Sequence, residues 1–190
     1  NVDVIPGSYV YLKKVNYLKL KDKLNKVKDN YDFIIIDSSP SLNEEILATM
    51  LASDNLFVVT TPDYPTLSCS LSAARLAKQR GKPISGIIIN KIRDPKYEIG
   101  LEEIEKAAGI PVIARIYDDK ENVRSLFTRI PMPVYNRKSK FSKEINRIGA
   151  ALDSKREKGS FLRSLFQLNF RKEEVNRQFL KEDFYRREFK

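Results

Sequence analysis

The sequence predicts an α/β fold: a mostly parallel sheet with helices on both faces, followed by a C-terminal helical tail. From Val2 to about Ile116, short β-branched runs alternate with longer segments of helical period, which is typical of parallel strands joined by crossover helices. The 190 residues are 42% apolar, enough for one sizeable core. After Leu152 the character changes to a charged stretch. We therefore expect one domain over residues 1–152 and a basic amphipathic tail over residues 153–190.

Each strand is predicted from a short apolar run, and each helix from apolar residues at helical spacing. The expected strands are Val2–Ile5, Phe33–Asp37, Leu56–Thr60, Ile84–Asn90 and Val112–Ile116. The expected helices are Tyr17–Lys28, Leu42–Leu51, Leu67–Gln79, Leu101–Ala108, Lys120–Phe127 and Phe141–Leu152. Ser41 and Glu44 have the spacing of a capping box, which predicts a helix start at this point. Gly81 and Gly109 are expected to end two of the helices.

Composition excludes several classes of site. The sequence has one cysteine, Cys69, and no histidine, so it cannot build an internal disulfide framework or a Cys/His metal cluster.

No apolar run approaches the roughly 18 to 20 residues that span a bilayer, and the start at Asn1 has no signal-peptide character. We expect a cytoplasmic protein, and a chain cut out of something longer. The formal charge is +10, and sixteen Lys/Arg against eight Asp/Glu from Arg137 to Lys190 contribute +8 of it.

An ionisable side chain, Asp37, directly follows the apolar run of the strand predicted at Phe33–Asp37. Ligands of open parallel sheets bind at the carboxyl ends of strands. A carboxylate there is costly unless a cation or several donors meet it, and in phosphate-handling sheets that cation is Mg²⁺ held through water. The alternative is that Asp37 only caps the loop that follows.

The run from Asp37 to Leu42, Asp-Ser-Ser-Pro-Ser-Leu, resembles the Walker B segment of the MinD/ParA family of P-loop ATPases, although Ser39 replaces the usual proline. The resemblance implies that Asp37 binds Mg²⁺ through water. It also implies that Ser38 and Pro40 belong to a switch loop that senses the γ-phosphate of ATP. Leu56–Asp63 is similar to the next strand of the family and its Thr-x-Pro-Asp loop.

Two later segments continue the resemblance in the same order. Ile87–Lys91 is similar to the strand whose terminal asparagine recognises the adenine edge, which implies nucleotide contacts for Asn90 and Lys91. Ile110–Asp119 is similar to the strand and Ile-Pro-Glu-Asp loop that lie against the base, with Tyr117 in place of the proline. This implies base contacts for Tyr117 and Asp118. Including Pro133-Val134, Ser139 and the helix after them, the resemblance covers about residues 2–152, a partial MinD/ParA-type nucleotide-binding domain with ATP or ADP and Mg²⁺ as cofactors.

The phosphate-binding loop of the family, Lys-Gly-Gly-x-Gly-Lys-Thr/Ser, has no counterpart in these 190 residues, whose seven glycines all stand singly. We therefore predict no catalytic residue in this chain and no ATP hydrolysis by the chain alone. In the family, the first strand lies between the strands that end here at Asp37 and Thr60. We expect the sheet to lack this strand, and we expect the missing part elsewhere on the polypeptide or on a separate fragment.

In the tail, Lys158–Phe166 resembles the short C-terminal membrane-targeting helix of MinD-type members. On a helical wheel the apolar side chains share one arc and the polar ones the other. This predicts a helix lying in a membrane surface, with Phe161, Leu162, Leu165 and Phe166 on the inserted arc and Arg163 on the polar arc. The flanking basic residues are expected to face anionic headgroups: Lys155, Arg156, Lys158 and Arg171. The alternative is a helix that folds back on the domain or binds a partner protein.

These features together predict a nucleotide-switched positioning ATPase of the cell-division or partitioning type. ATP would close a homodimer, the tail would hold it at the inner face of the cell membrane, and hydrolysis would release it; a regulator protein is expected as a partner. One alternative is a ParA-like partition ATPase bound to nonspecific DNA, and another is a non-catalytic scaffold derived from the family. A phospho-acceptor receiver domain is a third alternative. It needs an acidic pair near its N-terminus and a Lys-Pro step after a later strand. It is disfavoured, because Asp3 lacks an acidic neighbour and Lys91 is followed by isoleucine.

Overall fold

A computed structural model describes residues 2–6, 16–38, 43–82, 84–153 and 171–188. The chain forms two compact units, Asn1–Asp54 and Asn55–Lys190. The N-terminal unit is mainly helical, and the C-terminal unit contains the sheet.

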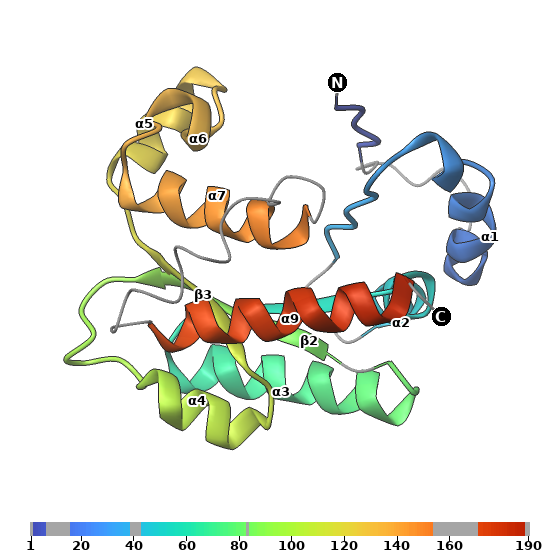
Figure 1. Ribbon diagram of the computed structural model, residues 1–190, viewed down its shortest axis with the longest axis horizontal. Coiled ribbons are helices and arrows are strands. Elements are labelled where there is room, and N and C mark those ends of the chain that lie inside the picture. Colours follow the sequence, from blue (N-terminus) through green and yellow to red (C-terminus); the bar gives the residue numbers. More distant parts are fainter. Residues whose placement is uncertain (1, 7–15, 39–42, 83, 154–170, 189–190) are drawn as a thin grey trace. The chain divides into compact units, whose positions relative to one another are not determined.

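The sheet of the C-terminal unit is parallel, with strand order β1-β2-β3. Its strands are β1 (Leu56–Thr60), β2 (Ile84–Ile92) and β3 (Val112–Tyr117). Two helices, α3 (Tyr64–Gln79) and α4 (Leu101–Ala108), cover one face, and α7 (Lys140–Leu152) and α9 (Lys172–Glu188) lie across the other (Figure 1). Two short helices, α5 (Glu121–Thr128) and α6 (Met132–Tyr135), connect β3 to α7. The predicted α/β fold with helices on both faces is confirmed.

The core of this unit lies between the sheet and the helices α3 and α4. Ile87, Ile104 and Val112 are fully or almost fully buried in it. At Gly86 a Cβ atom would lie 2.7 Å from Cγ2 of Ile113, so the packing requires glycine there. The predicted helix stop at Gly109 is confirmed, because this residue has φ +63° and donates its N–H to the end of α4. Gly81 also has a positive φ, of 69°, just after α3.

The helix α9 is attached to β3 and α7 through polar side chains. Arg177 donates to the carbonyl oxygen of Ile113 at 2.6 Å and to Oε1 of Glu144 at 2.8 Å, and both charged side chains are buried. Asn176 donates to the carbonyl oxygen of Val112 at 2.7 Å, and Glu173 pairs with Arg115 of β3 at 2.8 Å. This end of the tail therefore packs on the sheet, while the boundary between residues 152 and 153 stays a prediction.

The N-terminal unit contains η1 (Tyr17–Lys19), α1 (Leu20–Asn25), η2 (Lys28–Asn30) and α2 (Glu44–Ala52). The single helix predicted over residues 17–28 is thus divided into short pieces. The helix predicted over residues 42–51 begins at Glu44, where Asn43 caps it by accepting from the N–H groups of Glu45 and Ile46. The predicted cap, Ser41, lies outside the described residues.

Two predicted strands were wrong. Neither residues 2–5 nor residues 33–37 form a strand in the structure. Their apolar side chains are exposed, with Val2 at 88% and Ile35 at 88%, except for the half-buried Ile36. The physical reason is that a strand is stabilised only by a hydrogen-bonded neighbour, and neither segment has one among the described residues. Among the residues that the structure describes, β1 pairs with β2 only.

Candidate functional site

The carboxyl end of β2 holds the predicted base reader, Asn90. This half-buried residue accepts the N–H of Lys91 at Oδ1, at 2.9 Å. Lys91 has φ +56°, a left-handed conformation that is uncommon outside glycine and asparagine. Strain of this kind is concentrated at functional sites. The strand continues to Ile92 with a shifted register, so the backbone is distorted where Asn90 and Lys91 stand.

The end of β3 lies beside the end of β2. Tyr117 pairs with Ile92, and the N–H of Asp118 donates to the carbonyl oxygen of Ile92 at 2.8 Å. Neighbouring strands in a sheet are about 4.8 Å apart. The structure therefore brings the predicted residues of the two strand ends, Asn90 with Lys91 and Tyr117 with Asp118, to one edge of the sheet.

Two basic residues that sequence reasoning missed fix this edge. Arg93 pairs with Asp118 through Nε and Oδ2 at 2.9 Å, in an exposed ion pair. The ammonium group of Lys140, at the start of α7, lies 5.8 Å from the centre of the Tyr117 ring, within the range of a cation–π interaction. Tyr117 itself is half-buried. A weak signal for Lys140 was available, because Ser139 is a good helix cap and places Lys140 at the first position of the helix.

The turn after β1 is held by its own side chains. Asp63 caps α3 by accepting the N–H of Thr66 at 2.9 Å, and the hydroxyl of Thr61 donates to the same carboxylate. These hydrogen bonds, that from Thr61 most strongly, lower the pKa of Asp63 from its ordinary value. Asp63 is therefore a carboxylate at neutral pH, and its role here is to start α3 rather than to exchange protons.

In the N-terminal unit, Asp37 and Ser38 line a hollow of about 200 Å³. The other polar residues of its lining are Asn16, Tyr17, Lys23, Glu45 and Thr49, so oxygen groups and one cationic side chain face the hollow, and Leu20, Ile36 and Ala48 complete its apolar part. Asp37 is exposed and follows the half-buried Ile36. Oxygen ligands of this kind suit Mg²⁺, which keeps several waters and binds few protein groups. No cluster of three or more metal-ligating side chains occurs among the described residues.

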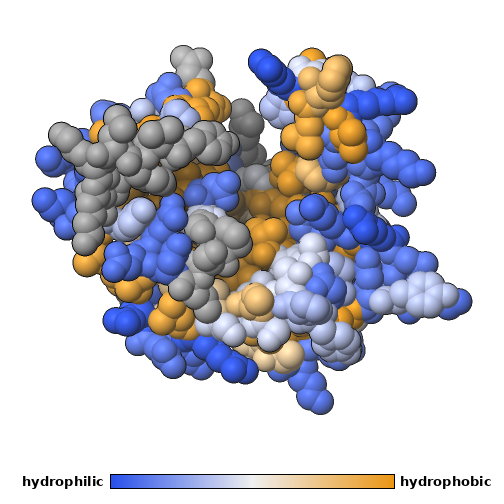
Figure 2. Space-filling model, turned by 180° about the vertical axis from the view of Figure 1, so that it is seen from behind, coloured by the Kyte–Doolittle hydropathy of each residue, from blue (hydrophilic) through white to orange (hydrophobic). Residues whose placement is uncertain are grey.

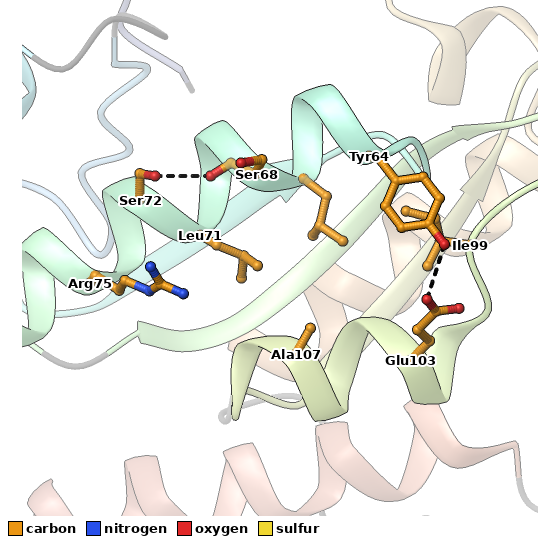
Figure 3. A pocket seen from close by; sticks show the side chains of 9 residues that line it. Tyr64, Ser68, Leu71, Ser72, Arg75, Ile99, Glu103 and Ala107 are labelled. Carbon is orange, nitrogen blue, oxygen red and sulfur yellow. Dashed lines mark hydrogen bonds between the residues drawn. The ribbon is translucent and has the colours of Figure 1, made fainter.

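A second hollow, also of about 200 Å³, lies between α3 and α4. At one end the hydroxyl of Tyr64 donates to Oε1 of Glu103 at 3.1 Å, and Leu71 and Ala107 form an apolar floor (Figure 3). Arg75 lies at the other end. The hydrogen bond to Glu103 raises the pKa of Tyr64. Sequence reasoning assigned no function to this groove, although Tyr64, Leu67, Leu71 and Arg75 have helical spacing along α3.

The remaining predicted site residues lie outside the part of the chain that the structure describes. These are Pro40 in the switch loop, and Phe161, Leu162, Arg163, Leu165 and Phe166 in the predicted membrane helix. Among the described helices, none is long and apolar enough to cross a bilayer.

The chain is similar to known proteins over part of its length. A family profile described as an AAA domain matches residues 7–75. An uncharacterised ATP-binding protein of Methanocaldococcus jannaschii is 32% identical over 113 residues, which cover 60% of this chain and 43% of that protein. The sporulation initiation inhibitor protein Soj of Bacillus subtilis is 31% identical over 120 residues, covering 56% of this chain and 47% of Soj.

Solved structures with the same fold include two ATPases. The cell division ATPase MinD of Pyrococcus furiosus matches with a TM-score of 0.65 and 25% identity, over 71% of this chain and 57% of that one. A ParA family ATPase of Chlorobium tepidum matches with a TM-score of 0.63 and 28% identity, over 72% and 57%. The present chain spans about half the length of the curated relatives it matches.

Proposed function

We propose that this chain is part of a MinD-type positioning ATPase and supplies the base-binding and Mg²⁺-binding half of its ATP site. Its similarity to proteins of the MinD/ParA group supports this proposal. The observation that carries the proposal is the joint placement of Asn90 and Tyr117 at adjacent strand ends. The relatives named as ATP-binding proteins and ATPases give the ligand class.

The edge formed by β2 and β3 has the chemistry that an adenine base requires. The carboxamide of Asn90 offers one acceptor and two donors, which matches the alternating polar groups on the edge of the base. The ring of Tyr117 offers a face for stacking, and aromatic stacking on a base is worth roughly 1–3 kcal/mol. Lys140 and Arg93 would act by holding Tyr117 and Asp118 in place.

Asp37 is proposed to hold Mg²⁺ through a water molecule. The metal would neutralise charge on the phosphates of the nucleotide. Ser38 and Pro40 would form the switch loop that responds to the γ-phosphate. The phosphates themselves require a glycine- and lysine-rich loop, a sequence that does not occur in these 190 residues, so we propose that the complete site includes a further segment.

The working cycle that we propose is that of a nucleotide-switched dimer. ATP would close two copies on each other, and the amphipathic segment with Phe161, Leu165 and Phe166 would then hold the dimer on an anionic membrane surface. Hydrolysis would open the dimer and release it, and a regulator protein would set the timing. The sequence of the segment and the homology to MinD support this cycle.

A second candidate is a partition ATPase that uses duplex DNA as its surface. The observations in its favour are the 31% identity with Soj and the formal charge of +10. Salt-dependent binding to nonspecific DNA that survives deletion of residues 161–166 would support this candidate.

The test is ATP binding by a polypeptide that carries this chain and a preceding phosphate-binding segment. A fluorescent ATP analogue is titrated into the parent protein and into Asn90→Ala, with Asn25→Ala, an exposed asparagine of α1, as the matched control. We expect Asn90→Ala to weaken binding about tenfold, the equivalent of one lost charge-neutral recognition contact of roughly 1.4 kcal/mol. If the folded parent binds neither ATP nor vesicles, the proposed function is wrong.

A further inference from the structure

The helix α5 has its apolar residues on the solvent side. Val123, Leu126 and Phe127 are 72%, 79% and 89% exposed, whereas Ser125 is only 5% exposed. Positions i, i+3 and i+4 of a helix lie on one face. The hydroxyl of the buried Ser125 donates to the carbonyl oxygen of Ile130, so a polar residue occupies the buried side of this helix. This is the reverse of an ordinary surface helix, whose apolar stripe faces the core.

The exposed apolar surface continues through the turn into α6. Ile130 is 41% exposed and Val134 is 63% exposed. We call the five residues the apolar ridge: Val123, Leu126, Phe127, Ile130 and Val134. In Figure 2 hydrophobic side chains gather over α5 and α6, at the upper right, with hydrophilic ones around them. Contiguous exposed apolar surface beside polar residues marks an interaction site.

The segment that carries the apolar ridge is rich in basic residues. Between Lys120 and Lys140 the sequence has six Lys/Arg and a single acid, Glu121. Arg124 and Arg129, which flank the ridge, are both exposed. The one acid accepts a hydrogen bond from Nδ2 of Asn136 and is half-buried. The surface around the ridge is therefore cationic, and two copies of it would repel each other. A partner that binds this surface must therefore be anionic and must also accept apolar side chains.

We propose that the apolar ridge docks on an anionic lipid surface, with Leu126 and Phe127 entering the boundary between headgroups and acyl chains. Arg124 and Arg129 then face the lipid headgroups, where each basic residue is attracted by the surface potential. Duplex DNA would satisfy the cations, but its phosphates offer no apolar surface for Leu126 and Phe127. An anionic bilayer satisfies both sets of groups.

This inference deepens the membrane role within the proposed function and rests on it, but the contact is separate from residues 161–166. It requires neither bound nucleotide nor a phosphate-binding segment. A lipid contact by the ridge would give the protein two points of attachment on one surface, which fixes its orientation. Two weak attachments also hold a protein far more firmly than one.

The first experiment uses the absence of tryptophan from the sequence. Phe127→Trp provides a single reporter on the ridge, and Tyr97→Trp provides a matched one at a site that is 82% exposed and outside the ridge. Both full chains are mixed with vesicles of phosphatidylglycerol and phosphatidylcholine, or of phosphatidylcholine alone. We expect the emission of Phe127→Trp to shift to the blue on anionic vesicles and to be quenched by lipids brominated in their acyl chains. The emission of Tyr97→Trp should stay unchanged. An unshifted, unquenched Phe127→Trp would overturn the proposal.

The second experiment separates the ridge from the tail. Co-sedimentation with anionic vesicles compares the parent chain with Leu126→Ser/Phe127→Ser and with Phe161→Ser/Phe166→Ser. Because Leu126 and Phe127 are exposed, their substitution should leave the circular dichroism spectrum unchanged. We expect the ridge variant to bind vesicles about tenfold more weakly. Loss of binding in the tail variant alone would overturn the ridge contact and leave the proposed function standing. The proposal would also be overturned if the parent chain bound duplex DNA but no vesicles, and if Arg124→Ala abolished that DNA binding.

Discussion

Removal of Arg177 should show that α9 is an integral part of the sheet domain. The Arg177 side chain is 7% exposed and its partner Glu144 is 8% exposed. Truncating one member of a buried ion pair costs roughly 3–5 kcal/mol, because the other charge is left without its counter-ion. Glu144 keeps a second cation, Arg147, at 3.3 Å from its other carboxylate oxygen. We therefore expect Arg177→Ala to lower the free energy of unfolding by about 3 kcal/mol, the lower end of this range.

The assay is urea unfolding followed by far-ultraviolet circular dichroism. With slopes of roughly 1–3 kcal/mol per molar urea, the midpoint should fall by about 1 M or more. Arg177→Met combined with Glu144→Met removes both charges and should lose only about 1 kcal/mol, mainly from the carbonyl of Ile113 that no longer has its donor. Arg93→Ala breaks an exposed pair and should cost less than about 1 kcal/mol.

A cost of Arg177→Ala no larger than that of Arg93→Ala would show that the buried ion pair does not hold α9 on the sheet. A double methionine variant less stable than Arg177→Ala would show that the cost arises from lost packing rather than from an uncompensated charge.

Four further predictions concern stability. Burial would raise the pKa of Glu105, but hydrogen bonds from Lys172, from Asn176 and from a backbone N–H outweigh it and lower the pKa below its ordinary value of 4.5. The stabilisation of the folded state by Glu105 is therefore fully present above its ordinary pKa. It is lost as the pH falls through the lower pKa that Glu105 has in the folded protein. Glu105→Gln should remove this part of the acid dependence in thermal melts at graded pH. Gly86→Ala should destabilise the protein by roughly 1–3 kcal/mol because its Cβ would overlap a neighbour. Gly149→Ala, on an open surface of α7, should instead stabilise it by about 0.5–1 kcal/mol in the same urea assay. Asn43→Ala should cost about 1 kcal/mol and lower the helix content of the N-terminal unit, since it removes the cap of α2.

The sequence was most informative where local pattern and burial agree. The strands β1, β2 and β3 and the helices α3, α4 and α7 lie within a few residues of their predicted ranges. Their apolar residues fill the core, so periodicity reports packing directly. The same pattern failed at residues 2–5 and 33–37. A β-branched run forms a strand only where another strand pairs with it through hydrogen bonds, and the local sequence does not specify that partner.

Polar packing was harder to predict than apolar packing. The buried face of α9 carries Glu173 and Arg177 beside Leu180, and the buried face of α5 carries Ser125. Hydrophobic periodicity therefore indicates the wrong side of α5 and gives only part of the buried face of α9. Their partners are distant in sequence: Arg177 meets Glu144 and the backbone of Ile113. Among the predicted site residues, the order of the strands was enough to bring Asn90 near Tyr117. The contact of Lys140 with Tyr117 depends on how α7 approaches the sheet, which no motif encodes.

The central claim is that the ends of β2 and β3 hold the adenine base, and the most direct measurement is a nuclear magnetic resonance titration with Mg-ADP. The protein is labelled with ¹⁵N and carries a preceding phosphate-binding segment. We predict that the side-chain amide signal of Asn90 and the backbone signals of Tyr117 and Asp118 shift in proportion to bound nucleotide. Saturable binding of Mg-ADP that leaves all three signals in place would contradict the claim.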